Sequence, residues 1–172
     1  MHPHRRHDPS KSLVGFVVGE VRYAVSISRV RELTNPLPLV ALPHAPPAVI
    51  GVAEYRGEVV PVVDLRLRFG LPPAPETRRT KWIVLDYNER FVALVVDAVV
   101  EVFGTGGSEL RPAPSLGGGE DVRGIAGVTN LGDNMVFVLD AGRFAELTAP
   151  LVAQGALASG IPRVAIAEKA RT

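Results

Sequence analysis

Three aspartates follow apolar segments and are the first candidates for catalytic chemistry. Asp64, Asp97 and Asp140 stand in the sequences VVDL, VVDA and VLDA. Two such carboxylates held close together would share a proton and act as a paired-aspartate hydrolase, because repulsion would separate their pKa values. Neither Asp64 nor Asp140 has the adjacent Thr/Ser-Gly pair that positions an acid-protease aspartate. A carboxylate between a strand and a turn can instead accept backbone N–H bonds. We interpret all three as structural caps, with a small hydrolase as a rival hypothesis.

Other catalytic and ligand-binding chemistry has few candidate residues. The chain has no cysteine, which excludes thiol catalysis and disulfide bonds. No serine lies in a Gly-x-Ser-x-Gly motif, and the glycine-rich runs after residue 103 lack the Lys-Ser/Thr pair of a phosphate-binding loop. His44 is the one histidine outside the N-terminal segment, where His2, His4 and His7 have no partner at metal-ligand spacing. We therefore expect no enzyme activity, no metal and no cofactor.

The element that organises the chain is the segment 49–71, VIGVAEYRGEVVPVVDLRLRFGL. Two β-branched runs flank a polar corner that contains Gly57, which predicts a β-hairpin. Asp64 ends the second strand, and the segment 65–69 is expected to form a short helical turn before Gly70.

This hairpin recurs in the sequence. The segment 51–64 matches 127–140 at an offset of 76 residues, and a weaker match relates 27–33 to 96–102 at an offset of 69. The matched pairs include Gly51 with Gly127, Asp64 with Asp140, Val30 with Val99 and Glu32 with Glu101. Two copies of one unit indicate a pseudo-symmetric domain rather than a solenoid.

The remaining chain supplies more strands and one linker. Strands are expected at 13–18, 21–25, 80–87, 91–96 and 99–103, with a strand around 37–42 and a terminal helical turn at 141–147. Ile27, Val30 and Leu33 are three residues apart, which predicts a short helix or helical turn capped by Ser26 and with Glu32 on its other face. The proline-rich segment 72–79 is expected to be the linker at which the two lobes meet.

Composition limits the class of protein. The 172 residues carry a net charge of +1, so nothing favours nucleic acid or an anionic membrane as partner. No apolar run approaches the ~20 residues of a spanning helix, and the N-terminus has no apolar signal region, so we expect a cytoplasmic protein with no direct membrane insertion. We predict a disordered tail at 1–12, a domain at 13–147 and a C-terminal tail or helix at 148–172.

Five motifs in their order give the chain a family resemblance. They are FVVGEVRYAVSISRVREL (16–33), VIGVAEYRGEVVPVVDLRLRFG (49–70), KWIVLDYNERFVALVVDAVVEV (81–102), LRPAPS (110–115) and IAGVTNLGDNMVFVLDAGRF (125–144). The chain resembles the CheW-like family of chemotaxis coupling proteins. The resemblance implies an all-β fold of two interleaved, SH3-like five-stranded β-barrel subdomains in pseudo-repeat, with short helices and flexible ends. It also implies a non-catalytic adaptor between the cytoplasmic tip of a chemoreceptor and the regulatory domain of a CheA-type histidine kinase.

The resemblance further implies a set of partner-binding residues. The matching positions are Val30, Glu32, Gly51, Arg56 and Gly57. Val30 would supply an apolar contact and Glu32 and Arg56 polar contacts, while the two glycines would allow a close approach of the partner backbone or a turn.

One corner departs from the family pattern. The family usually has Asn-Leu-Arg-Gly there, whereas this chain has Glu54-Tyr55-Arg56-Gly57. We expect this change to alter receptor preference or to mark a divergent pathway. The alternative function is a divergent CheW-like interaction module that serves a different scaffold or kinase outside chemoreceptor arrays.

Overall fold

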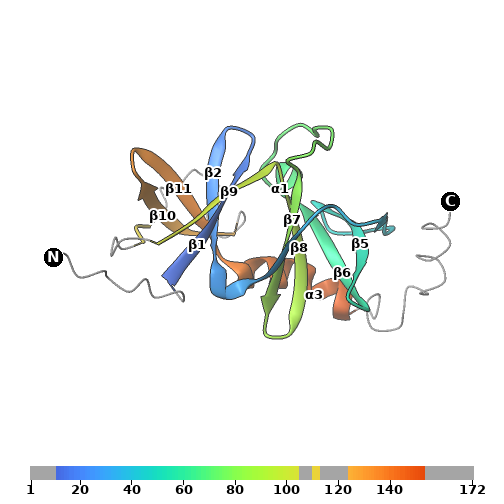
Figure 1. Cartoon of the computed structure of the whole chain (residues 1–172). Coiled ribbons are helices and arrows are strands. Elements are labelled where there is room, and N and C mark those ends of the chain that lie inside the picture. The colour runs from blue at the N-terminus through green and yellow to red at the C-terminus, as the bar shows by residue number, and fades with distance from the viewer. Residues whose placement is uncertain (1–10, 105–109, 113–123, 154–172) are drawn as a thin grey trace.

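Two β-sheets make up most of the molecule (Figure 1). The computed structural model describes residues 11–104, 110–112 and 124–153. The first sheet has the strand order β10-β11-β2-β1-β9 and the second β3-β7-β8-β6-β5-β4. The first comprises β1 (Ser12–Val18), β2 (Val21–Ser26), β9 (Ala98–Gly104), β10 (Ile125–Leu131) and β11 (Asn134–Leu139). The second comprises β3 (Val30–Thr34), β4 (Leu39–Val40), β5 (Val49–Tyr55), β6 (Glu58–Asp64), β7 (Lys81–Tyr87) and β8 (Arg90–Val96). The predicted all-β class is confirmed, and the two sheets fit two SH3-like subdomains; the second has a sixth, two-residue strand.

The internal repeat is visible in the strand pairing. In each sheet one hairpin is joined to the next by a short parallel pairing, β6 with β8 and β11 with β2. In each sheet the edge strand β3 or β9 pairs antiparallel with a hairpin strand and shifts register at the same place. Equivalent pairs are Val62–Ala93 with Val138–Ala24, and Val30–Leu85 with Val99–Phe16. The residues matched in the sequence at offsets of 76 and 69 therefore occupy equivalent positions in the two subdomains.

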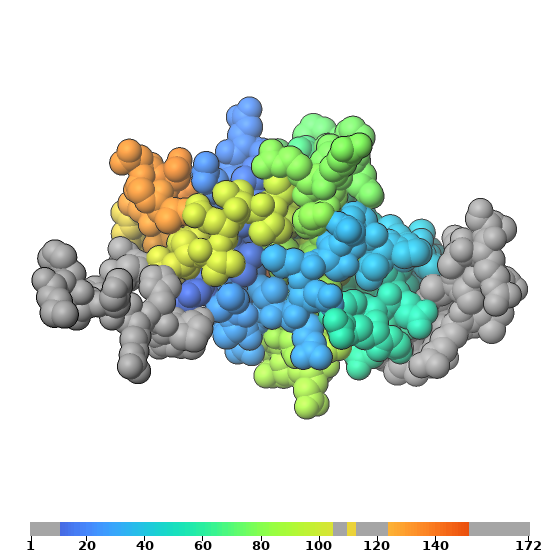
Figure 2. All heavy atoms as spheres, in the orientation of Figure 1, coloured from blue at the N-terminus to red at the C-terminus, as the bar shows by residue number. Residues whose placement is uncertain are grey.

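The segment 72–79 separates the two repeat copies along the chain, as expected, but it does not separate the two sheets. That segment connects β6 and α1 (Leu65–Arg68) to β7, and β6 and β7 belong to the same sheet. The chain changes sheet between β2 and β3 and returns between β8 and β9. Each edge strand thus pairs with the hairpin of the other copy. In Figure 2 the yellow β9 region accordingly lies between the orange β10–β11 hairpin and the blue β3–β4 region.

The predicted helix after Ser26 is confined to one 3-10 turn, η2 (Ile27–Arg29). Ser26 makes no side-chain cap, because its hydroxyl is hydrogen-bonded to that of Ser28 at 2.8 Å. From Val30 onward the backbone pairs with β7 and forms a strand. Three apolar residues at a spacing of three were too short a pattern to separate helix from strand, and tertiary pairing decided the outcome.

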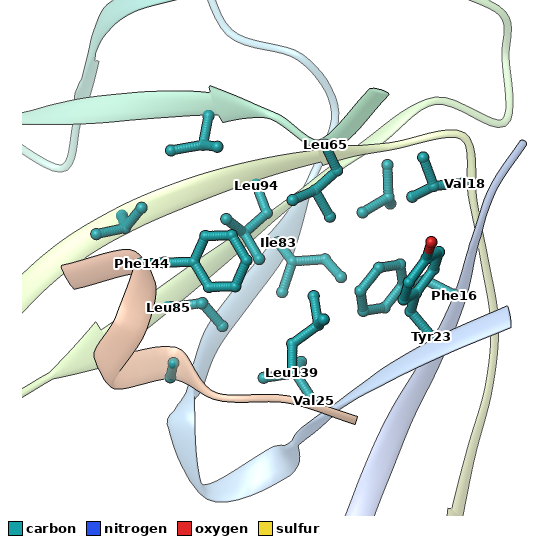
Figure 3. Packing of buried hydrophobic residues seen from close by; sticks show 14 of the residues in the cluster. Phe16, Val18, Tyr23, Val25, Leu65, Ile83, Leu85, Leu94, Leu139 and Phe144 are labelled. Carbon is teal, nitrogen blue, oxygen red and sulfur yellow. The ribbon is translucent and has the colours of Figure 1, made fainter. Parts of the chain in front are cut away.

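The core has three parts. The largest cluster lies between the sheets and combines residues of β1, β2, β7 and β8 with Leu139 and Phe144 (Figure 3). Two smaller clusters fill the subdomains, one around Trp82 and Val62 in the second sheet and one around Phe103 in the first. The subdomains therefore bury a common apolar face, which fixes them against each other.

The chain termini differ in part from expectation. β1 begins at Ser12, whose side chain is buried, so the strand includes the last residue of the expected N-terminal tail. The terminal helical turn is the longer helix α3 (Ala141–Ala153), which packs against β7 and β8 (Figure 1). Buried Leu151 anchors its last turn. The predictions for residues 1–10, the glycine-rich runs at 105–107 and 115–119, and 154–172 lie outside the described residues.

Candidate docking site

The strand-end aspartates Asp64 and Asp140 are caps. The Asp64 carboxylate accepts a hydrogen bond from the backbone N–H of Arg66 at 2.8 Å at the start of α1. Asp140 accepts the N–H of Gly142 at 2.9 Å at the start of α3. Each carboxylate satisfies a backbone donor at its own strand end, and the two ends belong to different sheets. This arrangement supports the cap interpretation over a shared-proton pair.

Asp97 has a larger structural role than a cap. It lies between β8 of the second sheet and β9 of the first. Its two oxygens accept Arg66 Nε at 2.9 Å and Nη2 at 2.7 Å, and Oδ2 also accepts the N–H of Gly19 in the β1–β2 turn at 2.7 Å. Burial raises the pKa of Asp97, but the bonds from Arg66 and Gly19 outweigh it, so the pKa lies below the ordinary 3.8. This ion pair ties the two subdomains together at their junction.

Replacing Asp97 with asparagine is expected to lower the free energy of unfolding at pH 7 by about 2 kcal/mol, because Arg66 then loses its bidentate, partly buried acceptor. The folded-state pKa is depressed, so this contribution is present above pH 3.8 and is lost as the pH falls through the lower folded-state value. Denaturant unfolding at several pH values measures it. Asp133→Asn, in the exposed β10–β11 turn, is the control. A gap between the Asp97 variant and wild type that does not shrink in acid would contradict the assignment.

A bulge in β3 separates two of the predicted docking residues. Val30 pairs with Leu85 and Glu32 with Val84, so the register shifts by one residue between them. In a regular strand Val30 and Glu32 would share a face, but the extra residue turns Glu32 to the opposite side. Val30 consequently packs against the core between the sheets, while Glu32 projects on the side of the cluster inside the second subdomain.

Glu32 meets Tyr55 and Arg56 at the end of β5. Its Oε2 atom accepts a hydrogen bond from the Tyr55 hydroxyl and another from Arg56 Nε at 3.2 Å, and Arg56 Nη2 also lies 3.2 Å away. The hydrogen bond from Tyr55 is the largest influence on the pKa of Glu32, and together with Arg56 it lowers that pKa despite opposing desolvation. Burial and the bond to Glu32 raise the pKa of Tyr55. The pair Glu32–Arg56, here called the docking pair, is therefore ionised over a wider acidic range than an isolated glutamate.

Arg56 occupies a conformation that is unfavourable for its residue type. It forms the β5–β6 turn with Gly57, and both residues have positive φ, 48° and 81°. Such turns favour Asn, Asp or Gly at the first position, and a branched or long side chain there is strained. The equivalent position in the other subdomain is Gly132, with φ of 59°. The side chain of Arg56 is nevertheless 64% exposed. A strained, exposed arginine in a turn that accepts glycine indicates a function beyond folding.

Three of the five predicted residues gather at one place: Glu32, Arg56 and Gly57. Val30 lies on the other face of β3, half-buried in the core between the sheets. Gly51 is buried, and the close backbone approach expected from a partner is made by Val40 of this chain: an added Cβ would lie 2.3 Å from its carbonyl oxygen.

Sequence reasoning missed the role of Tyr55. It weighed Tyr55 together with Glu54 as a change to the exposed corner, yet the structure exposes Glu54 and buries Tyr55. Neighbouring residues of a strand point to opposite faces, so the two substitutions act on different sides of the sheet. The available signal was strand alternation through the segment 49–55, which places the tyrosine on the same side as buried Ala53.

Comparison with known proteins shows the family of this chain. A model of the CheW-like domain family matches residues 12–148, well over half of the chain. The chain belongs to the CheW-like family. A CheW-like relative, the probable chemotaxis protein CheW of Rhizobium etli, is 30% identical over 130 residues, covering 76% of this chain and 84% of that protein. The chemotaxis protein CheW of Rhizobium meliloti is 37% identical over 106 residues, covering 62% and 68%.

The CheW-like fold is also found by structural comparison. The scaffolding protein TtCheW from Thermoanaerobacter tengcongensis superposes with a TM-score of 0.70 and 26% identity, over 82% of this chain and 91% of that one. Within the described part of this CheW-like chain, no group of three or more His, Cys, Asp or Glu side chains is placed to hold a metal ion. No helix in those same residues has the length and apolar character to cross a membrane.

Proposed function

We propose that this CheW-like protein is a non-catalytic, cytoplasmic adaptor that couples chemoreceptors to a CheA-type histidine kinase. The kinase regulatory domain and the cytoplasmic tip of the receptor are its two partners. Membership of the CheW-like family supports the adaptor role, and the capping roles of Asp64 and Asp140 remove the most plausible catalytic pair. Nothing in the described residues favours the alternative of a module outside chemoreceptor arrays.

The observation that carries this proposal is the docking pair. Glu32 on the edge strand β3 and Arg56 in the β5–β6 turn meet at the surface with side-chain exposures of 36% and 64%. An exposed ion pair adds little to folding, because solvent screens it and the side chains lose entropy. A partner that covers the docking pair would exclude this solvent. The charged hydrogen bonds of the pair would then be stronger, and they would favour a partner surface of complementary charge and geometry.

Calorimetry with separately purified partners tests the proposal. The full chain is titrated with the regulatory domain of the CheA-type kinase from the same organism and, in a second series, with the cytoplasmic hairpin of a receptor. We expect saturable binding to both, with a Kd on the order of micromolar for the kinase domain, as for other transient signalling contacts. A folded chain that binds neither partner would overturn the adaptor function.

A further inference from the structure

The Tyr55 hydroxyl joins two strands of the second sheet that are not neighbours in it. In the strand order β3-β7-β8-β6-β5-β4, β3 and β5 are separated by three strands and make no ladder with each other. The hydrogen bond from Tyr55 on β5 to Glu32 on β3 crosses this gap. Glu32 is thus held at the point where the sheet curls back on itself, by a donor from the non-adjacent strand β5.

The ring that carries this hydroxyl is itself fixed. Tyr55 is only 6% exposed, and Phe91 of β8 packs edge-on against it with centroids 6.0 Å apart and planes at 88°. The Arg56 guanidinium carbon lies 5.5 Å from the centre of the Tyr55 ring. Tyr55 therefore contacts both members of the docking pair, one through its hydroxyl and the other through its ring, from a buried position with little rotational freedom.

The first subdomain provides an internal comparison. Glu101 is the equivalent of Glu32, and Leu131 and Gly132 are the equivalents of Tyr55 and Arg56. Glu101 and Leu131 line the same shallow depression, but leucine has no donor and glycine no charge. The closure of a subdomain therefore does not need a tyrosine–glutamate bond. Among the residues that the structure describes, the additional contacts accompany the exposed Arg56 of the second subdomain.

We propose that Tyr55 is a positioning residue for docking, which holds Glu32, and through it Arg56, in the orientation that meets an acidic group of the partner. This inference rests on the proposed adaptor function. Oε2 of Glu32 accepts a hydrogen bond from Arg56 Nε and forms an ion pair with Nη2. The planar guanidinium has five N–H donors in all, so donors remain for a partner. A carboxylate is the partner group whose two oxygens match the planar set of guanidinium N–H donors. Fixing the guanidinium in advance lowers the entropy lost on binding.

A double-mutant cycle tests the inference. Tyr55→Phe keeps the ring and removes the hydroxyl, and Glu32→Ala removes the acceptor. We expect Tyr55→Phe to weaken binding of the kinase regulatory domain about tenfold in the wild-type background but less than about twofold in the Glu32→Ala background. NMR titration of the Glu32 carboxyl should show a higher pKa in Tyr55→Phe than in wild type, because its strongest stabilising bond is lost. Tyr87→Phe, in the same sheet, is the matched control.

The outcomes separate this inference from the adaptor proposal. Wild-type affinity in Tyr55→Phe, or equal losses in both backgrounds, would overturn the positioning role. Failure of the wild type to bind would overturn the adaptor function. In that case the docking role of Tyr55 falls with it, and the titration reports only on the contact: an unchanged Glu32 pKa in Tyr55→Phe would show that the hydroxyl does not hold the carboxylate, and a raised pKa would show that it does.

Discussion

Alanine in place of Gly51 is expected to lower the free energy of unfolding by about 3 kcal/mol, among the largest effects of a single methyl group in a packed site. The added Cβ would lie 2.3 Å from the carbonyl oxygen of Val40 and 2.9 Å from its carbonyl carbon. Both contacts are with backbone, and β4 is held to β5 by the pairs Leu39–Ala53 and Val40–Val52. The backbone φ of 153° adds strain for any residue with a side chain. Denaturant unfolding measures the change.

Gly57→Ala is the matched control for this substitution. An added Cβ at Gly57 meets nothing within 4 Å, so only the positive φ of 81° opposes it. We expect a cost of about 1 kcal/mol. Similar losses at Gly51 and Gly57 would contradict the internal role of Gly51. If the Gly51 variant loses more unfolding free energy than the Gly57 variant, then any loss of partner binding by the Gly51 variant would reflect disturbed packing against Val40. It would not show that Gly51 itself contacts the partner.

Reversing the charge of Arg56 is expected to weaken binding of the kinase regulatory domain at least about a hundredfold, the size of effect seen at interface hot spots. Arg56→Glu places a carboxylate beside Glu32 and opposite the acidic group expected on the partner. Both interactions then change from attraction to repulsion. Calorimetry at moderate ionic strength measures the affinity, and the difference from wild type should narrow as salt is added.

The fold of the Arg56 variant should be intact, because the ion pair is exposed and the turn position has no buried side chain to lose. Arg90→Glu is the matched control, an exposed arginine at the start of β8 in the same sheet. It should bind like the wild type. Equal affinities of the Arg56 and Arg90 variants would mean that the docking pair is not part of the interface.

The sequence repeat predicted more of the fold than any single motif did. Matching Val30 with Val99 and Glu32 with Glu101 related the segments that form the equivalent edge strands β3 and β9, although the first of them was predicted as a helical turn. It did not reveal that each edge strand pairs with the hairpin of the other copy. Sequence order carries no information about which neighbour a strand pairs with when both candidates have the same apolar pattern. The lobe boundary was therefore placed at the proline-rich linker.

The candidate site was predicted in part. Glu32 and Arg56 were expected at an exposed rim, and the structure places them together there. Their contact depends on the β3 bulge and on curling of the second sheet, and neither can be read from a local pattern of residue types. Gly51 was assigned to a partner contact because the family resemblance implied it. A glycine permits any close approach, and here the approach comes from the same chain.

Reconstitution of the three-component assembly tests the central claim most directly. Receptor cytoplasmic domains displayed on vesicles are mixed with the CheA-type kinase, with or without this protein, and kinase is quantified in the vesicle pellet. If the chain is a coupling adaptor, kinase sediments with the receptors when the wild-type chain is present and much less with Arg56→Glu. Equal kinase in the pellet with and without the wild-type protein would contradict the proposed coupling role.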